Sequence, residues 1–138
     1  MLDIFIDRFQ GRWSNFTQAT NNPRSASLVY VTHEYTGDGF VCSYTRGRQK
    51  NPYRYFEASL YTYDGNTILR NPIHDIIFHM EGGAYITKAE FESNGIRYIN
   101  EAYLGEKHYH VKDQGFRIET GQQLWGLPDG EFYEFRRC

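Results

Sequence analysis

The stretch Ala84–Leu104, AYITKAEFESNGIRYINEAYL, decides the fold class. Over Ala84–Glu92 and again over Gly95–Leu104 the pattern has a period of two, which is typical of a half-buried strand. Between them, Ser93-Asn94-Gly95 is the sharpest turn signal in the chain, because Asn-Gly favours turns whose twist matches that of the flanking strands. The stretch therefore predicts an antiparallel β-hairpin.

The same alternation extends over most of the chain. Tyr53–Tyr63 alternates up to Asp64-Gly65-Asn66, and Ser27–Tyr35 pairs with Phe40–Thr45 around Gly37-Asp38-Gly39. Further short strands are expected at Thr67–Arg70, Asp75–His79, His108–Lys112, Gln122–Trp125 and Glu131–Arg136. Ahead of the strands, the apolar spacing predicts a short helix over Leu2–Arg8, which Gly11 ends, and a second helical turn over Ser14–Ala19.

About ten short strands with short connections indicate an antiparallel meander in one domain, residues 1–138. A long meander in a small domain tends to close on itself, because closure removes the unpaired edge strands. We therefore expect an all-β, up-and-down barrel of the calycin or lipocalin kind with an N-terminal helix. A barrel of eight to ten strands has an interior wide enough for one small ligand.

Composition supports strands rather than helices. The 138 residues include 12 Tyr, 10 Phe, 2 Trp and 13 Gly, a mix that favours twisted strands and tight turns and excludes a mainly disordered chain. The net charge of −2 provides no global field for a nucleic acid. The aromatic excess predicts an exposed apolar face, and from it we expect a homodimer.

Cysteine use and the N-terminus predict a soluble, cytoplasmic protein with reduced thiols. Cys42 and Cys138 form neither a disulfide framework nor a metal cluster. Asp3, Asp7 and Arg8 interrupt the segment where a secretory signal would need an apolar core. The chain has no run near the roughly 20 apolar residues of a membrane span.

Two features suggest a ligand inside the barrel. The strand Tyr53–Tyr63 has one charge on each of two semi-apolar faces, which fits either an ordinary core or a lumen that holds an amphipathic ligand. Around its start, Arg46, Arg48, Lys50 and Arg54 form either an anion clamp or a solvated hairpin loop. Arg54 needs a partner in either case, because an unpaired buried guanidinium is costly.

The histidines raise a metal hypothesis. His108 and His110 share one face of a strand, as in cupin-type metal sites, but the chain offers no convincing second motif, and exposed strand histidines are the simpler interpretation. The chain has no Ser-His-Asp order, phosphate-binding glycine loop or Cys-X-X-Cys motif. The sequence therefore predicts no metal and no prosthetic group.

Three blocks resemble one family in order and position. They are Trp13–Ala19 followed by Asn22-Pro23, then Pro52-Tyr53-Arg54, and finally Asp113–Phe116 with Thr120–Gly126, Gly130 and Phe135. They are similar to the opening, the PYR motif and the closing block of the T-type phycobiliprotein lyases, the CpcT/CpeT family. The blocks span residues 13–136, almost the whole chain.

This resemblance implies a calycin barrel that binds an open-chain tetrapyrrole (a bilin such as phycoerythrobilin). Such a lyase receives its pigment from a bilin reductase and delivers it to a cysteine of a phycobiliprotein β-subunit as a thioether. The resemblance places Tyr53, Arg54, Asp113 and Trp125 in or around the pigment site. Tyr44, Arg46 and Phe56 complete the expected bilin-binding set, and either Asp113 or Glu101 is expected to protonate a pyrrole nitrogen.

The chain departs from the family pattern at several positions. Phe56 replaces a second Arg after the PYR motif, Gln114 replaces the Arg of the closing D-R-G, and Arg117 replaces an acidic residue. The chain is also short, like versions carried by viruses of cyanobacteria, which suggests a cyanobacterial, possibly infected, cytosol. Three other functions remain open: a bilin carrier without ligation activity, a small nucleic-acid-binding barrel that uses Arg46–Tyr55, and, ranked third, a metal-dependent barrel enzyme that uses His108 and His110.

Overall fold

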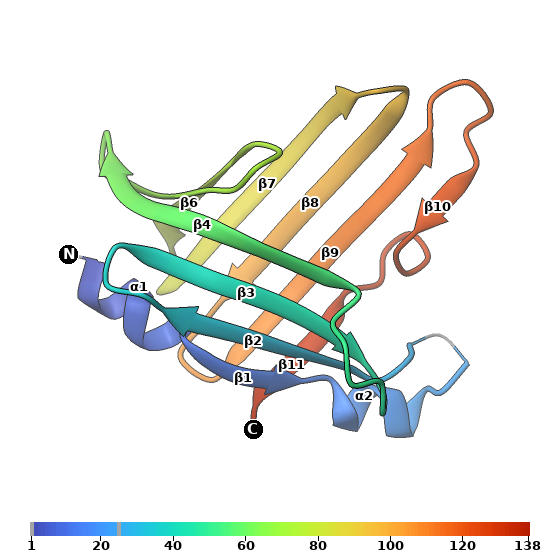
Figure 1. Cartoon of the computed structure of the whole chain (residues 1–138), viewed down its shortest axis with the longest axis horizontal. Coiled ribbons are helices and arrows are strands. Elements are labelled where there is room, and N and C mark those ends of the chain that lie inside the picture. The colour runs from blue at the N-terminus through green and yellow to red at the C-terminus, as the bar shows by residue number, and fades with distance from the viewer. Residues whose placement is uncertain (1, 25) are drawn as a thin grey trace.

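The computed structural model describes residues 2–24 and 26–138, which form one barrel with two short helices (Figure 1). The helices are α1 (Leu2–Phe9) and α2 (Phe16–Asn21). The strands are β1 (Gly11–Ser14), β2 (Val29–Tyr35), β3 (Gly39–Arg46), β4 (Arg54–Tyr63), β5 (Asn66–Arg70), β6 (Asp75–Glu81), β7 (Ala84–Ser93), β8 (Ile96–Leu104), β9 (His108–Arg117), β10 (Gln123–Trp125) and β11 (Tyr133–Arg137). Among the described residues, no helix is long and apolar enough to cross a membrane.

Ten strands close the barrel in an antiparallel ring. Strands β1 to β9 pair in chain order, β11 lies between β9 and β1, and β8 pairs with β9 along its whole length. The remaining strand, β10, pairs only with Gly115 and Phe116 near the end of β9. The predicted closed all-β barrel with an N-terminal helix is therefore confirmed, with β11 inserted between β9 and β1.

Two local predictions were incomplete. The sequence analysis missed β1, because four residues are too few to establish a period; its pairing with both β2 and β11 makes it a strand. The strand predicted at His108–Lys112 also ends too early, because β9 continues to Arg117. Asp113, Gln114 and Gly115 have low strand propensity, but pairing with β8 keeps them extended.

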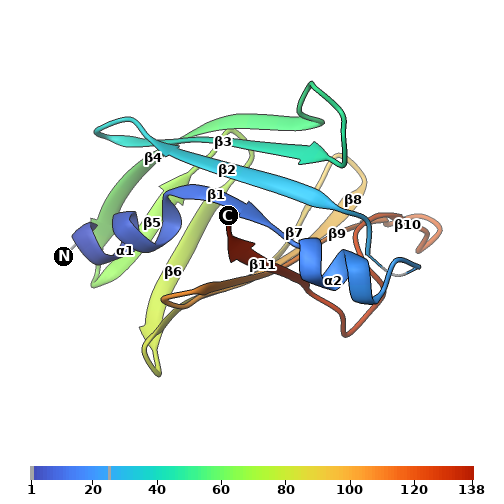
Figure 2. The ribbon, with the colours of Figure 1, turned by 90° about the horizontal axis from the view of Figure 1, so that it is seen from below.

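Helix α1 fills one end of the barrel. Phe5 and Phe9 lie one helical turn apart and are fully buried, with Phe5 5.1 Å from the rings of Phe78 and Tyr85 and Phe9 4.8 Å from Phe40. Figure 2 shows α1 beside the strand ends at this side, with α2 at the other side. The aromatic core therefore occupies only part of the interior, and the other end is left for a pocket.

The Asn15 and Gln18 side chains explain the first sequence block. Asn15 is buried; its amide donates to the Ser27 carbonyl at 2.8 Å and accepts from the Val29 N–H at 2.7 Å. Gln18 donates to the Phe132 carbonyl at 2.6 Å and accepts from the Glu134 N–H at 3.0 Å. Each amide thus pairs with backbone as a further strand residue would, and together they fix α2 against two strands.

Replacing Asn15 by alanine should lower the free energy of unfolding by about 2 kcal/mol, because it leaves the buried Val29 N–H and the Ser27 carbonyl without their side-chain partner. Urea denaturation monitored by circular dichroism measures this loss. The matched control is Asn21→Ala, since Asn21 lies exposed at the end of the same helix and should change stability by less than about 0.5 kcal/mol. Equal losses in the two variants would contradict the role given to Asn15.

Candidate ligand-binding pocket

A pocket of about 330 Å³ opens at the end of the barrel away from α1. Its lining residues are Arg46, Tyr53, Arg54, Ile73, His74, Phe91, Tyr98, Asn100, Asp113, Trp125, Gly126 and Tyr133. Arg46 ends β3, whereas Phe40, which packs on α1, is near the start of that strand. The pocket brings the PYR motif and the closing block together from opposite halves of the chain.

An ion pair between Arg54 and Asp113 lies at the base of this pocket. Arg54 Nη1 donates to Asp113 Oδ2, and Trp125 Nε1 donates to the other carboxylate oxygen at 3.1 Å. The two charged side chains retain 33% and 23% of their exposure, so each still faces the pocket. Burial lowers the pKa of Arg54, but the neighbouring Asp113 charge more than compensates, so that pKa is raised on balance. The partner required for Arg54 is thus Asp113.

Asn100 and His74 extend this polar network. With its amide oriented so that nitrogen faces acceptors, Asn100 donates to Asp113 Oδ1 at 3.1 Å. The other amide atom lies 3.5 Å from His74 Nε2, and the His74 ring packs on Phe91 with centroids 4.2 Å apart. Burial lowers the pKa of His74, which keeps the imidazole neutral at pH 7. Neither residue was among the candidates from the sequence.

Aromatic rings form the walls above the ion pair. Phe91 stacks on Tyr98 with centroids 4.8 Å apart and an interplanar angle of 4°, and Tyr98 lies 5.5 Å from Trp125. On the opposite wall, the Arg46 guanidinium lies 4.4 Å from the centre of the Tyr53 ring. The pocket therefore offers flat apolar surfaces around one ion pair, an arrangement suited to a planar ligand with a few polar atoms.

Gly115 makes room for Trp125. A Cβ atom at Gly115 would lie 2.2–2.4 Å from three atoms of the Trp125 ring, far inside contact distance. Gly126, which directly follows Trp125, has a φ of +103°, and a Cβ there would lie 2.5 Å from the Asp113 carbonyl oxygen. These two glycines explain the D-x-G and W-G pairs of the closing block: they let the indole lie against β9 and reach Asp113.

Substituting alanine for Gly115 should displace Trp125 from the pocket and weaken ligand binding about tenfold, because one aromatic wall and one hydrogen bond to Asp113 are lost. A change in tryptophan fluorescence, assigned with Trp125→Phe, reports the displacement, and absorbance titration reports the binding. Gly105→Ala is the control, since the nearest atom to a Cβ there is 3.8 Å away. A Gly115→Ala protein with wild-type fluorescence and affinity would contradict this packing role.

A smaller cavity of about 60 Å³ lies below the ion pair, and Tyr44 and Phe56 line it instead of the outer pocket. The Arg54 guanidinium lies 5.5 Å from the centre of the Tyr44 ring and 5.4 Å from that of the Phe56 ring, and it forms a cation–π contact with each. Cys42 is buried beside them, and burial raises the pKa of its thiol to about 12. Tyr44 and Phe56 thus support Arg54 from below, and Cys42 is unsuited to act as a nucleophile.

Glu101 does not join the ion pair. It is the cross-strand neighbour of Lys112, and their charged groups lie 3.8 Å apart. The Lys112 ammonium in turn lies 5.0 Å from the Phe132 ring, which lines a cleft outside the barrel. Because successive residues of a strand point to opposite faces, Asn100 reaches the pocket and Glu101 does not. Of the two expected acids, the structure brings only Asp113 to the pocket.

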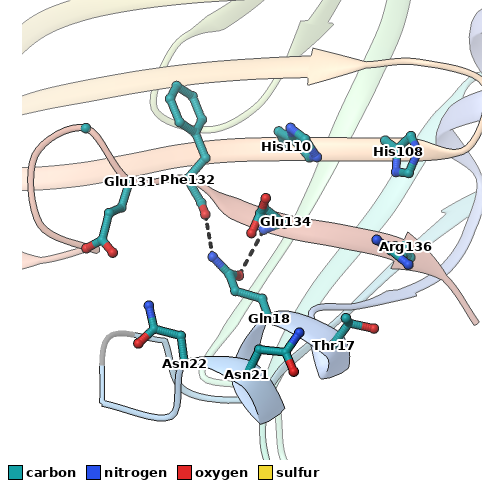
Figure 3. Close-up of a pocket in the computed structure, with 11 residues that line it drawn as sticks. Thr17, Gln18, Asn21, Asn22, His108, His110, Glu131, Phe132, Glu134 and Arg136 are labelled. Atoms are coloured by element: carbon teal, nitrogen blue, oxygen red, sulfur yellow. Dashed lines mark hydrogen bonds between the residues drawn. The ribbon is translucent and has the colours of Figure 1, made fainter.

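His108 and His110 lie in that outer cleft, which has a volume of about 670 Å³ and runs between α2 and strands β9 and β11 (Figure 3). Their ring centroids are 5.9 Å apart. Within residues 2–24 and 26–138, no group of three or more His, Cys, Asp or Glu residues is placed to hold a metal ion. The cleft is mainly polar and includes Gln18, whose side-chain amide hydrogen-bonds to the backbone of Phe132 and Glu134.

Solved structures provide the comparison for this geometry. The T-type phycobiliprotein lyase CpeT from Prochlorococcus phage P-HM1 superposes with a TM-score of 0.84 at 28% sequence identity, over 100% of this chain and 98% of that one. This chain is a structural relative of the T-type phycobiliprotein lyases. The resemblance seen in the three sequence blocks is thereby confirmed over the full length of the barrel.

A second solved structure shares the fold of this T-type lyase relative. The CRL protein of Arabidopsis matches with a TM-score of 0.71 at 14% identity, over 99% of this chain and 96% of that one, which supports the barrel architecture alone. A scan against models of known protein families gives no match, and a search of curated proteins also gives none. The kinship therefore depends on the three-dimensional structure together with the sequence blocks.

Proposed function

We propose that the T-type lyase relative binds a bilin in the 330 Å³ pocket and delivers it to a cysteine of a phycobiliprotein β-subunit. The observation that carries the proposal is the convergence of two distant family-like blocks in one pocket, where Asp113 accepts hydrogen bonds from both Arg54 and Trp125. For this role a bilin reductase would supply the pigment, and the chain would act in the cyanobacterial cytosol, infected or not.

The pocket chemistry suits an open-chain tetrapyrrole. Its flat rings match the stacked walls of Phe91, Tyr98 and Trp125. An ionised carboxylate has about four acceptor positions, and Asp113 uses three of them on Arg54, Trp125 and Asn100, so it can accept one more hydrogen bond from a pyrrole N–H. We therefore assign Asp113 to hold and polarise one ring nitrogen of the pigment, with the negative charge favouring its protonated form.

Catalysis in this proposal is mainly positioning. The acceptor thiol adds across the ethylidene double bond of the bilin: sulfur bonds to the outer carbon, and the thiol proton ends on the ring carbon. The barrel shields the pigment from competing nucleophiles and orients it toward the acceptor. No thiol of this chain is required, in keeping with the raised pKa of Cys42 and its burial below Arg54.

A reconstitution assay tests the proposal. The chain is incubated with phycoerythrobilin and the apo-β-subunit, and the product is denatured and separated on a gel. We expect fluorescence that remains with the β-subunit and exceeds the level of spontaneous attachment. Visible-absorbance changes on mixing the chain with the pigment alone measure binding. A chain that leaves the pigment spectrum unchanged would exclude the proposed function.

A carrier without ligation activity is the second candidate. It is favoured by the hydrogen bonds that already engage both Asp113 oxygens, because a carboxylate held by Arg54 is a better acceptor than proton donor. The same assay separates the two functions: a carrier shifts the pigment spectrum but gives no attachment above the spontaneous level.

We also propose a homodimer formed through the outer face of β4 and β6, where Tyr55, Tyr63 and Ile77 are exposed. Light scattering measures the mass of the protein in solution and tests this proposal.

A further inference from the structure

The charges lining the pocket are unequally paired. Arg54 and Asp113 neutralise each other, and His74 is held neutral by burial. Arg46 is the remaining charged residue of the lining, and among the described residues no carboxylate lies within ion-pair distance of it. The pocket therefore carries one net positive charge, although it contains two guanidinium groups.

Arg46 is positioned to use that charge. Its guanidinium lies 4.4 Å from the centre of the Tyr53 ring. Its positive charge also acts to lower the pKa values of Tyr53 and Tyr133 on the same wall of the pocket, which burial raises. A cation stacked on an aromatic face keeps its N–H edge free, so the two parallel donors of the guanidinium can meet a carboxylate. Arg46 is exposed, and a ligand carboxylate can reach it from solvent.

The Arg54–Asp113 pair offers a different chemistry. Among the described residues, the Arg54 side chain makes one hydrogen bond, from Nη1, so its other guanidinium N–H groups are available beside the last acceptor position of Asp113. A donor next to an acceptor on a neutral pair complements an uncharged group with a carbonyl and an N–H side by side, such as the lactam of a terminal bilin ring. It provides no excess charge for a second carboxylate.

We infer that the pocket recognises one carboxylate of its ligand through Arg46, while the Arg54–Asp113 pair binds an uncharged amide-like portion. This inference rests on the proposed function and deepens it: a bilin has two propionates, and only one is held in the pocket. The volume of about 330 Å³, at the small end for a ligand site, agrees with a pigment that is only partly enclosed.

Absorbance titration of phycoerythrobilin as the free acid and as its dimethyl ester tests the inference. We expect the wild-type chain to bind the acid about tenfold more tightly than the ester, the value of one charge-assisted hydrogen-bonded contact. Arg46→Gln should reduce this ratio to about one by weakening acid binding alone. Arg48→Gln, two residues further along and outside the pocket lining, should leave the ratio unchanged.

Asp113→Asn should move the ratio in the opposite direction. The substitution frees the Arg54 charge, so we expect the acid-to-ester preference to rise above its wild-type value while ester binding weakens. A wild-type ratio near one, an unchanged ratio in Arg46→Gln, or a ratio in Asp113→Asn at or below wild type would each overturn the inference. In those cases bilin binding itself would stand, whereas failure of both pigments to bind would remove the proposed function as well.

Discussion

Replacing Arg54 by alanine should lower bilin affinity by about a hundredfold, or about 2.7 kcal/mol. The variant leaves the Asp113 carboxylate without its cation, at a site where it retains 23% of its exposure and faces the ligand. The net charge of the pocket lining falls from one to zero, and the unpaired carboxylate repels a ligand propionate. The Arg54→Ala variant also lacks the Arg54–Asp113 hydrogen bond, which holds the Asp113 carboxylate beside Trp125. Absorbance titration with phycoerythrobilin measures the affinity.

A second variant separates the effect of losing the Arg54 guanidinium from the effect of leaving the Asp113 carboxylate unpaired. Arg54→Ala combined with Asp113→Asn restores a net charge of one, so we expect it to recover about tenfold of the lost affinity, and Arg48→Ala serves as the matched arginine control. Unfolding in urea should show Arg54→Ala to be less stable than wild type by about 2 kcal/mol, less than a fully buried pair would cost because both groups keep partial exposure. If the double variant binds no better than Arg54→Ala, the pairing argument is wrong.

The fold was predictable because its signals are local. Asn94-Gly95 and Asp64-Gly65 provide turns, both with positive φ at the two residues, and the strands between them alternate with a period of two. The one strand that escaped prediction, β1, has neither signal, and only its neighbours β2 and β11 make it extended. Strand propensity failed again after Lys112, where tertiary pairing with β8 prevails over the preferences of Asp113 and Gly115.

The pocket was predictable only in part, because its members are joined by register. Tyr53, Arg54, Asp113 and Trp125 were identified through the family blocks, without any indication that Arg54 and Asp113 would pair across 59 residues. Tyr98 and Asn100 were missed, although they lie opposite Gly115 and Asp113 in the β8–β9 register. Once that register is known, the same alternation that selects Asn100 rejects Glu101. His74 comes from the β5–β6 loop, where no periodic pattern places a side chain.

His33 creates the largest expected pH effect on stability. It is 1% exposed, stacks on Phe9 with centroids 3.7 Å apart, and donates from Nδ1 to the Phe9 carbonyl at 2.8 Å. Its Nε2 atom has no hydrogen-bond partner in the described part of the chain. Burial lowers the pKa of His33 from 6.5 to about 3, although the hydrogen bond to Phe9 acts to raise it. The folded barrel therefore holds this imidazole neutral where an unfolded chain would protonate it.

Between pH 6.5 and about 3 the unfolded chain binds one more proton at His33 than the folded chain, so stability should fall as the pH falls, by about 1.4 kcal/mol per unit. Urea unfolding at pH 7, 6, 5 and 4 measures this slope. His33→Asn keeps an N–H for the Phe9 carbonyl, and we expect it to be less stable at pH 7 but to lack the His33 contribution to the slope. His108→Asn, which removes an exposed imidazole, is the control. A slope unchanged in His33→Asn would mean that His33 binds its proton equally in both states, and the acid sensitivity of the barrel would then have to come from its carboxylates.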